Sequence, residues 1–281
     1  MSKIIYIAGL GHSGSTILDM SLGTIPGVVG VGELKTLMDD HSRNKHYTSV
    51  CSCGKPATEC VVWEKVPEIM QGKENDPEKI EAFLAHLKYI SGESVTMVDS
   101  SKNSYQYLRY LHENHDLKMI FLTRDVRSWS YSRYLSTGKP ILYFLVRWYL
   151  ENLKLKVRIR KMGIPFLKVG YEELSLYPEH LMKKITRYAA IPYDPSVLTP
   201  GNTGSHIISG NVARTDQQKR AAWLYDSRWM LSWRMMLLSP IVTFLHGKNK
   251  KYVYSNIMTG SMKDFHLFGT RRKEALSKTH N

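Results

Sequence analysis

Cysteine is scarce in this sequence, and long apolar runs are missing from it. Only three cysteines occur among 281 residues, an odd number and too few for the disulfide framework of a small secreted protein. No uninterrupted apolar stretch approaches the ~20 residues of a membrane-spanning helix, and no signal peptide precedes the first apolar segment. These absences favour a reducing compartment and predict a cytoplasmic protein.

Acidic residues are sparse in the second part of the chain. Residues 1–100 hold 9 basic and 13 acidic side chains, whereas residues 101–281 hold 30 basic and 12 acidic ones, a net charge of +18. A basic half of this size suits an anionic partner such as a nucleic acid, a membrane surface or a small polyanion. A solvated basic face would give the same count. The 43% hydrophobic content excludes a disordered chain.

Short apolar segments alternate with helical patterns along the chain. Strands are expected at 4–8, 28–31, 94–98, 117–123 and 165–169. Helices are expected at 16–22, 77–90, 104–114, 125–135, 141–162, 178–190 and 217–238. The alternation predicts a three-layer α/β fold with a mainly parallel central sheet and flanking helices. Residues 1–246 are expected to form one domain with a cysteine-containing insertion or lid at about 39–77, and 247–281 a basic, partly disordered or peripheral tail.

A glycine-rich turn follows the first expected strand. Gly9, Gly14 and Thr16 fit the phosphate-loop pattern, in which backbone N–H groups and a helix N-terminus bind an anion. Ser15 occupies the position of the usual lysine, which argues against an ordinary ATPase or kinase. The glycines also fit a dinucleotide fingerprint, although Glu33 meets its acidic position only loosely. A tight strand–helix connection would also explain them.

A second candidate site follows the strand at 117–123. Arg124 ends this strand, and Ser132 lies two helical turns further on. The fork of donors on an arginine and a serine hydroxyl can bind one phosphate together. The alternative is a surface ion-pair cluster of Arg124, Asp125 and Arg127, which would contribute little.

In combination, these motifs resemble the sulfotransferases that use 3′-phosphoadenosine 5′-phosphosulfate (PAPS), and the resemblance covers roughly residues 3–235. It implies a phosphate-loop fold shared with nucleotide kinases, with the 5′-phosphosulfate bound by Gly11, His12, Ser13, Gly14, Ser15 and Thr16. It implies 3′-phosphate binding by Arg124 and Ser132. The segment from Val169 to Leu174 resembles the family's element near the adenine, through Tyr171. The segment from His206 to Arg214 resembles a late element of bacterial members, in which Arg214 would contact phosphate.

The pattern is most similar to the branch that includes tyrosylprotein sulfotransferases. In that branch a Gly-Glu pair supplies the base and a later lysine aids catalysis, and Glu33 and Lys102 occupy those positions here. His12 departs from the family, which usually has arginine or lysine at this position. A protonated His12 would substitute for that cation. The alternative is that His12 is only a loop residue that faces a phosphate. The resemblance implies no metal. The expected acceptor is a small molecule, carbohydrate, lipid or peptide, with no nucleic acid partner and with contact to a membrane surface left open.

Two rival functions and two residue clusters remain open. Asp99 after the strand at 94–98 could hold Mg²⁺ in a nucleotide-dependent kinase, and the basic half could belong to a non-enzymatic binder of nucleic acid or membrane. Cys51, Cys53 and Cys60 are interpreted first as structural thiols, then as a local disulfide, and third as a zinc site completed by His41 or His46. The tryptophans and methionines of 217–238 are expected to pack a terminal helix.

Overall fold

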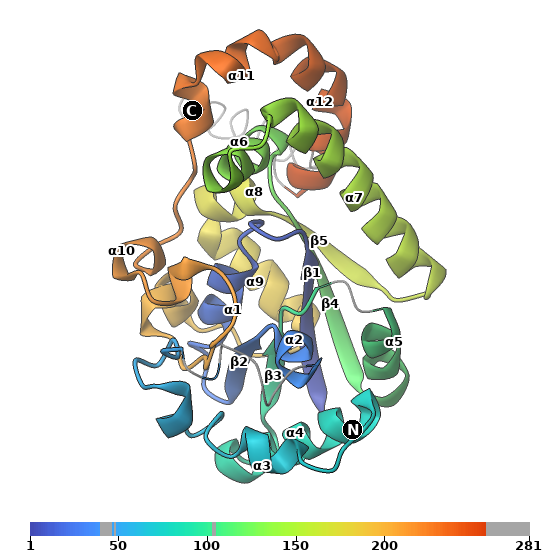
Figure 1. Ribbon diagram of the computed structural model, residues 1–281, viewed down its shortest axis with the longest axis vertical. Helices are drawn as coiled ribbons and strands as arrows, with labels where there is room; N and C mark the ends of the chain where they lie inside the picture. Colours follow the sequence, from blue (N-terminus) through green and yellow to red (C-terminus); the bar gives the residue numbers. More distant parts are fainter. Residues whose placement is uncertain (40–46, 48, 103–104, 257–281) are drawn as a thin grey trace, which may run out of the picture.

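The computed structural model describes residues 1–39, 47, 49–102 and 105–256. Its centre is a five-stranded parallel sheet with the strand order β2-β3-β1-β4-β5 (Figure 1). The strands are β1 (Lys3–Gly9), β2 (Val28–Gly32), β3 (Thr96–Asp99), β4 (Asp116–Thr123) and β5 (Phe166–Gly170). Each coincides with one of the apolar segments in the sequence. The predicted three-layer α/β fold is therefore confirmed.

Helices enclose the sheet on both faces (Figure 1). The α-helices of the described chain are α1 (Ser15–Leu22), α2 (Leu34–Asp39), α3 (Val66–Met70), α4 (Asp76–Ser91), α5 (Tyr105–Asn114), α6 (Val126–Thr137), α7 (Ile141–Lys161), α8 (Tyr171–Leu176), α9 (Pro178–Ala189), α10 (Gln217–Arg220), α11 (Trp233–Leu237) and α12 (Ser239–Val253). Short 3-10 helices are η2 (Ala57–Glu59), η3 (Pro195–Leu198), η4 (Pro200–Asn202), η5 (Val212–Arg214) and η6 (Arg228–Leu231). The cap of α4 is Asn75, whose side chain accepts from the Glu78 N–H.

The sheet separates two hydrophobic cores. Ile5 and Ile7 of β1 pack on one face with α1, α8 and α9, whereas Ile4 and Tyr6 pack on the other face with α4 to α7. Successive side chains of a strand point to opposite faces. Because both faces are covered, the strands are apolar along most of their length, as parallel strands usually are. None of the helices in the described part of the chain combines the length and apolar character that crossing a bilayer requires.

The described part of the expected insertion packs into the body of the protein. Ala57 and Trp63 are fully buried and belong to the same core as Ile4 of β1. The Trp63 ring lies 5.5 Å from the ring of Phe83 in α4. Residues 49–77 therefore form part of the wall next to β2, whereas 40–46 and 48 lie outside the described residues.

The prediction of one helix over 217–238 is wrong. This region forms the short helices α10, η6 and α11, joined by non-helical segments. Asp216 caps α10, which ends after one turn, and the chain is extended again at Ser232. Trp233 and Met236 are exposed instead of packing a core. The following helix, α12, includes the beginning of the expected basic tail; residues 257–281 lie outside the described residues.

Candidate functional site

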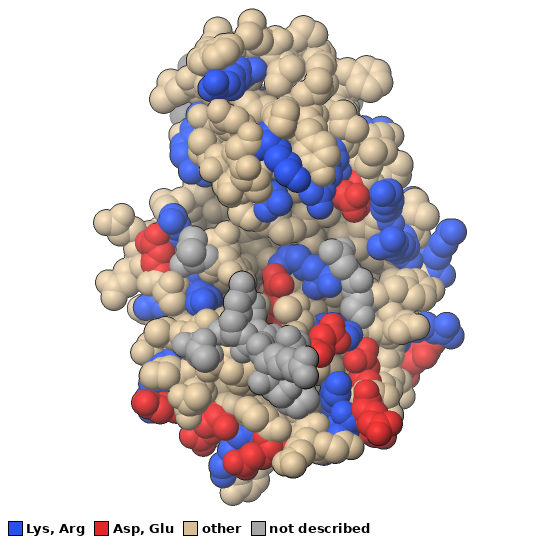
Figure 2. Space-filling model, in the orientation of Figure 1, with Lys and Arg blue, Asp and Glu red and all other residues tan. Residues whose placement is uncertain are grey.

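The residues expected to form the site follow the five strands of the sheet, one group after each strand. The glycine loop follows β1, Glu33 follows β2, Lys102 comes after β3, Arg124 follows β4 and Tyr171 follows β5. Parallel strands end at one edge, and open α/β sheets bind ligands in the crevice outside that edge. Figure 2 shows lysine and arginine side chains flanking a recess across the middle of this face, while acidic side chains gather toward the end formed by α3 and α4.

The glycine loop turns sharply between β1 and α1. Gly14 has a φ of 91° and precedes the first residue of α1, and His12 has a φ of 69°, which is uncommon for a residue with a side chain. The Ser13 N–H donates to the Leu10 carbonyl at 3.1 Å. The N–H groups of the first turn of α1 need acceptors from outside the helix, and an anion can supply them. The buried hydroxyls of Ser15 and Thr16 lie in the same turn.

Arg124 connects the end of β4 with this loop. Its Nη1 donates to the carbonyl oxygen of His12 at 2.9 Å, and its Nε donates to the Ser128 hydroxyl at 3.1 Å. Its Nη2 is paired with the carboxylate of Asp226. A guanidinium has five N–H donors, and these bonds use three of them. Two donors therefore remain for a ligand while Arg124 holds the loop.

Two buried carboxylates support the turn that carries Arg124. Glu172 accepts from the Asp125 N–H at 2.7 Å and from the Ser128 hydroxyl at 2.6 Å. Burial, together with the neighbouring charge of Asp125, raises the pKa of Glu172. Asp125 caps α6 and forms a two-point ion pair with Arg127. The expected surface cluster of Arg124, Asp125 and Arg127 is therefore mostly buried structure, with Asp125 fully inaccessible.

Glu33 and Lys102 form an ion pair at the ends of β2 and β3. Both side chains are largely but not fully buried, with 24% and 15% of their surfaces exposed. The adjacent Ser101 accepts a hydrogen bond from the Lys35 N–H at 2.8 Å, which fixes the two strand ends relative to each other. The structure thus brings together the proposed base and the proposed catalytic lysine, which are 69 residues apart in sequence.

His12 is surrounded by cations. Burial, followed by the charges of Arg133, Arg124 and Lys102, lowers the pKa of His12 to about 4. The imidazole is therefore neutral at pH 7 when no anion is bound. Arg133 follows the expected phosphate ligand Ser132 on α6, and its guanidinium lies 5.6 Å from the Phe144 ring. It was not singled out in the sequence, although its place beside Ser132 was a signal.

The remaining expected ligands take different positions. The Tyr171 ring packs directly against Gly14, where any side chain would collide with it. Its hydroxyl donates to the Leu224 carbonyl at 2.9 Å. Ser132 is half-buried on α6. Arg214 points Nη1 at the Val50 carbonyl, at 3.3 Å, and so contacts the cysteine-containing segment.

Two contacts, one of the loop and one of Arg124, had no signal in the sequence. The Trp129 indole N–H donates to the carbonyl of Gly11 at 2.8 Å and holds the loop from α6. Asp226, the ion-pair partner of Arg124, lies 102 residues further along the chain. A pocket also opens beside Lys102 between β1, α5 and α7. Its lining includes Tyr6, Lys102, Tyr105, Leu155 and Arg158.

Asp99 is unsuited to a metal. Its carboxylate is fully buried and accepts from the Ser101 N–H at 2.7 Å and from the Tyr107 hydroxyl. Burial raises the pKa of Asp99 to about 6. A Mg²⁺ ligand at the end of β3 would instead be an accessible, ionised carboxylate.

No protein-family model and no curated protein matches this chain. Solved structures are similar to it in fold. The sulfotransferase domain from the curacin biosynthetic pathway superposes with a TM-score of 0.50 and 12% identity, over 86% of this chain and 98% of that domain. The sulfotransferase domain of the Synechococcus PCC 7002 olefin synthase gives a TM-score of 0.49 and 15% identity, over 85% of this chain and 94% of that domain. Mouse sulfotransferase SULT7A1, solved in complex with PAP, gives a TM-score of 0.49 and 14% identity, over 95% of this chain and 89% of that chain. At these identities the likeness concerns the fold alone.

Proposed function

We propose that this chain is a sulfotransferase that moves a sulfuryl group from PAPS to a hydroxyl or amine acceptor. The observation that carries the proposal is the bond from Arg124 to the His12 carbonyl. Because of this bond the guanidinium of Arg124, with its fork of N–H donors, lies directly beside the glycine loop. A donor with phosphates at both its 3′ and 5′ positions needs this pair of neighbouring anion sites.

Different residues would bind different parts of the donor. The loop from Gly11 to Thr16 would bind the 5′-phosphosulfate through backbone N–H groups and hydroxyls. Arg124 and Ser132 would bind the 3′-phosphate, with Arg133 adding positive charge nearby. Tyr171 would lie against the adenine, and Arg214 is assigned a supporting phosphate contact.

Transfer would proceed by in-line attack at sulfur. Glu33 takes the proton of the acceptor hydroxyl while the acceptor oxygen forms its bond to sulfur. The bond from sulfur to the 5′-phosphate oxygen breaks, and 3′-phosphoadenosine 5′-phosphate (PAP) leaves with the electron pair. Lys102 stabilises the charge that develops on the bridging oxygen, as preorganised cations do in phosphoryl transfer. His12 supplies a cation only if donor binding protonates it.

The pocket beside Lys102 is the proposed acceptor site. It adjoins the catalytic pair, and its wall combines tyrosines, leucines and Arg158. The apolar and aromatic character of this wall puts phenols and peptide tyrosines first in an acceptor screen. Carbohydrate and lipid acceptors belong in the same screen.

A nucleotide kinase is the competing function, and two observations disfavour it. Ser15 stands where a phosphate-loop lysine would be, and Asp99 is buried in hydrogen bonds. Calorimetric titration with PAP and with ATP–Mg²⁺ separates the two functions. We expect PAP to bind and ATP–Mg²⁺ to bind at least tenfold more weakly. Equal or tighter binding of ATP–Mg²⁺ would overturn the proposal.

A further inference from the structure

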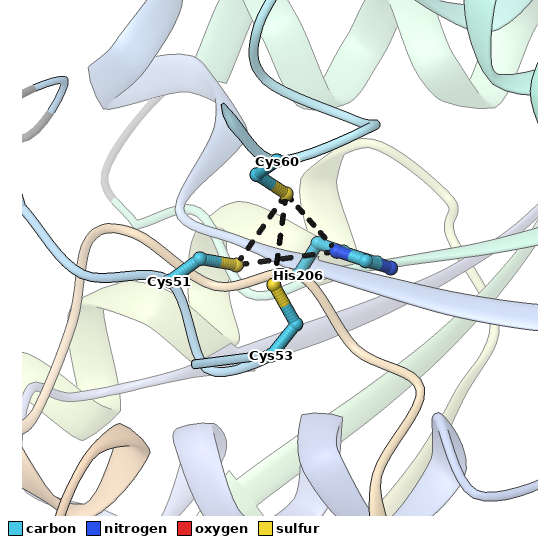
Figure 3. A group of neighbouring side chains, drawn as sticks. All are labelled: Cys51, Cys53, Cys60 and His206. Atoms are coloured by element: carbon cyan, nitrogen blue, oxygen red, sulfur yellow. Dashed lines mark hydrogen bonds between the residues drawn. The ribbon is translucent and has the colours of Figure 1, made fainter. Parts of the chain in front are cut away.

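Three cysteines and one histidine, His206, meet near β2, to which the His206 N–H is bonded at Gly30 (Figure 3). The Sγ atom of Cys60 lies 3.7 Å from that of Cys51 and 3.9 Å from that of Cys53. The Nδ1 atom of His206 lies 3.1 Å from Cys60 Sγ and 4.0 Å from Cys51 Sγ. All four atoms are within 4.8 Å of one another. In Figure 3 the four side chains converge on one point from two separate segments.

These separations match a tetrahedral zinc site. Zinc lies about 2.3 Å from sulfur and about 2.0 Å from nitrogen, so neighbouring ligand atoms sit about 3.5–3.8 Å apart. A disulfide needs sulfurs at about 2.0 Å, and all three cysteines are free. The contacts are therefore close to the edges of a zinc tetrahedron and well beyond those of a disulfide.

The backbone is built to hold this arrangement. Cys51 to Lys55 form a tight turn, in which the Cys51 N–H donates to the Lys55 carbonyl at 2.8 Å. Gly54 allows the turn through a φ of 91°. Ser52 joins this turn to the segment that carries His206. Its hydroxyl donates to the Ser205 carbonyl at 2.6 Å and accepts from the Ile207 N–H at 2.8 Å. His206 is thereby held opposite the turn.

His206 is fixed from two further sides. Its N–H donates to the Gly30 carbonyl of β2 at 2.7 Å, and its carbonyl accepts from the Trp63 indole at 2.7 Å. Cys51 and Cys60 are buried, whereas Cys53 lies at the surface and offers a route of entry. Four protein ligands that fill a tetrahedron are typical of structural zinc and leave no position for a substrate.

We propose that Cys51, Cys53, Cys60 and His206 bind one structural Zn²⁺. This corrects the expectation of no metal; the fourth ligands considered from the sequence, His41 and His46, lie outside the described residues. The ligand that the structure brings in is 146 residues from Cys60.

The metal would hold residues 207–211, which follow His206, against the glycine loop. Gly210 packs against the hydroxyl of Thr16, and the Asn211 N–H lies 3.4 Å from that oxygen. Ile207 packs on Gly32, the residue before Glu33. Zinc bound at His206 therefore holds a wall of the catalytic edge without contacting substrate.

The test is metal content of the full chain, purified with its thiols reduced. Mass spectrometry of the metal should find about one zinc per chain. Cobalt exchanged into the site should give the intense visible absorption of a tetrahedral cobalt–thiolate complex. Cys53→Ser is the preferred variant because Cys53 is exposed and the turn can form without it. Cys53→Ser and His206→Asn should each weaken zinc binding about 100-fold or more. Loss of a residue that only hydrogen-bonds to a ligand would weaken it less.

His180→Asn is the matched control, because His180 is exposed on α9. It should retain full zinc content and the cobalt spectrum. The proposal is overturned if the reduced wild-type chain takes up neither zinc nor cobalt. It is equally overturned if His206→Asn binds zinc as tightly as wild type. These readouts are independent of sulfotransferase activity.

A second and separate feature lies at the end of the molecule formed by α11 and α12 (Figure 1). Large apolar side chains are exposed there: Leu231, Trp233, Met236, Leu237 and Phe244. Residues 227–256 contain five basic side chains and no acidic one. On α12, Phe244, Lys248 and Lys251 are spaced by four and three residues and so share one face.

We infer that this end of the molecule rests on an anionic membrane surface. Exposed tryptophan, leucine and phenylalanine beside lysine and arginine are typical of helices that lie in the lipid headgroup region. A surface charge of one sign favours anionic lipid over a second copy of the chain, because two such faces would repel each other.

Co-sedimentation with vesicles tests this inference. We expect binding to vesicles that contain phosphatidylglycerol, little binding to pure phosphatidylcholine, and release at high salt. The double variant Trp233→Ser/Leu237→Ser should lose binding at least tenfold. Tyr89→Ser should not, because Tyr89 is exposed on α4 at the opposite end. Failure to bind anionic vesicles, or dimerisation through this face, would contradict the inference.

Discussion

The guanidinium of Arg124 donates to the backbone carbonyl of His12, and this bond joins residues that are 112 positions apart. It connects the end of β4 to the loop after β1. The proposed ligand of the 3′-phosphate therefore also shapes the proposed cradle of the 5′-phosphosulfate. A change at Arg124 should affect both ends of the donor.

Arg124→Lys keeps the charge but removes the fork of donors. We expect PAP to bind about 10- to 100-fold more weakly, since hydrogen bonds to charged groups contribute about 1.5–3 kcal/mol each. The preference for PAP over AMP, which lacks the 3′-phosphate, should fall with it. Calorimetry with both nucleotides measures the effect. The control Arg109→Lys, at an exposed site on α5, should change neither the PAP affinity nor the preference over AMP. Unchanged PAP affinity in Arg124→Lys would exclude Arg124 as a ligand of the 3′-phosphate.

Asp226 would compete with the proposed 3′-phosphate for Arg124. Its carboxylate is paired with Nη2 of Arg124 and also with Arg228. Asp226→Asn removes a negative charge beside the expected 3′-phosphate but keeps the shape of the side chain. PAP affinity should rise several-fold in equilibrium titrations. Asp216→Asn, a cap change on α10, is the control. A weaker affinity in Asp226→Asn would show that Asp226 mainly orients Arg124.

Glu33 and Lys102 should control turnover more than donor binding. Glu33→Gln should lower kcat by about 10²- to 10⁴-fold, the usual range for loss of a general base. Lys102→Met should lower it similarly, while PAP affinity stays within a few-fold of wild type. The matched controls are Glu179→Gln and Lys183→Met, which break an exposed ion pair on α9. Wild-type kcat in both site variants would refute the assigned roles.

The ionisation of His12 should respond to the donor. Burial and the nearby cations hold the pKa of His12 at about 4 in the free protein. Bound phosphates would offset these cations and raise that pKa. Proton NMR titration of the imidazole with and without PAP measures the shift, and His12→Gln identifies its resonance. The same low pKa in both states would show that His12 stays neutral and gives no positive charge to catalysis.

Asp99 should make the free energy of unfolding depend on pH. Burial raises its folded-state pKa from 3.8 to about 6, so the folded protein binds a proton that the unfolded chain releases. Its stabilising contribution is complete below pH 3.8 and is lost as pH rises through 6, a change of about 3 kcal/mol. Denaturant unfolding of wild type and Asp99→Asn at several pH values measures the difference. A wild-type stability that follows Asp99→Asn in parallel from pH 4 to 7 would contradict it.

The sheet could be predicted because its strands are apolar segments bounded by polar turns. The loop and Arg124 could be located from their phosphate-binding patterns, and Glu33 and Lys102 from the resemblance to sulfotransferases; the structure shows that all of them follow parallel strands that end at one edge. Contacts between distant segments left no local pattern: neither Asp226 nor His206 lies near its partners in sequence. The prediction of one helix over 217–238 was wrong because the apolar residues there belong to separate short helices: Trp223 and Met235 pack into the cores, whereas Trp233 and Met236 are exposed.

The catalytic edge draws one part from the end of every strand, so no shorter stretch of the chain contains it. Residues 1–33 would carry the loop and the base without the cations that complete them. The proposed donor nucleotide would therefore bind only after β4 has joined β1 and β5 has joined β4. Such a ligand selects the fully folded chain over every partly folded form, and its binding energy adds to the stability of the whole molecule.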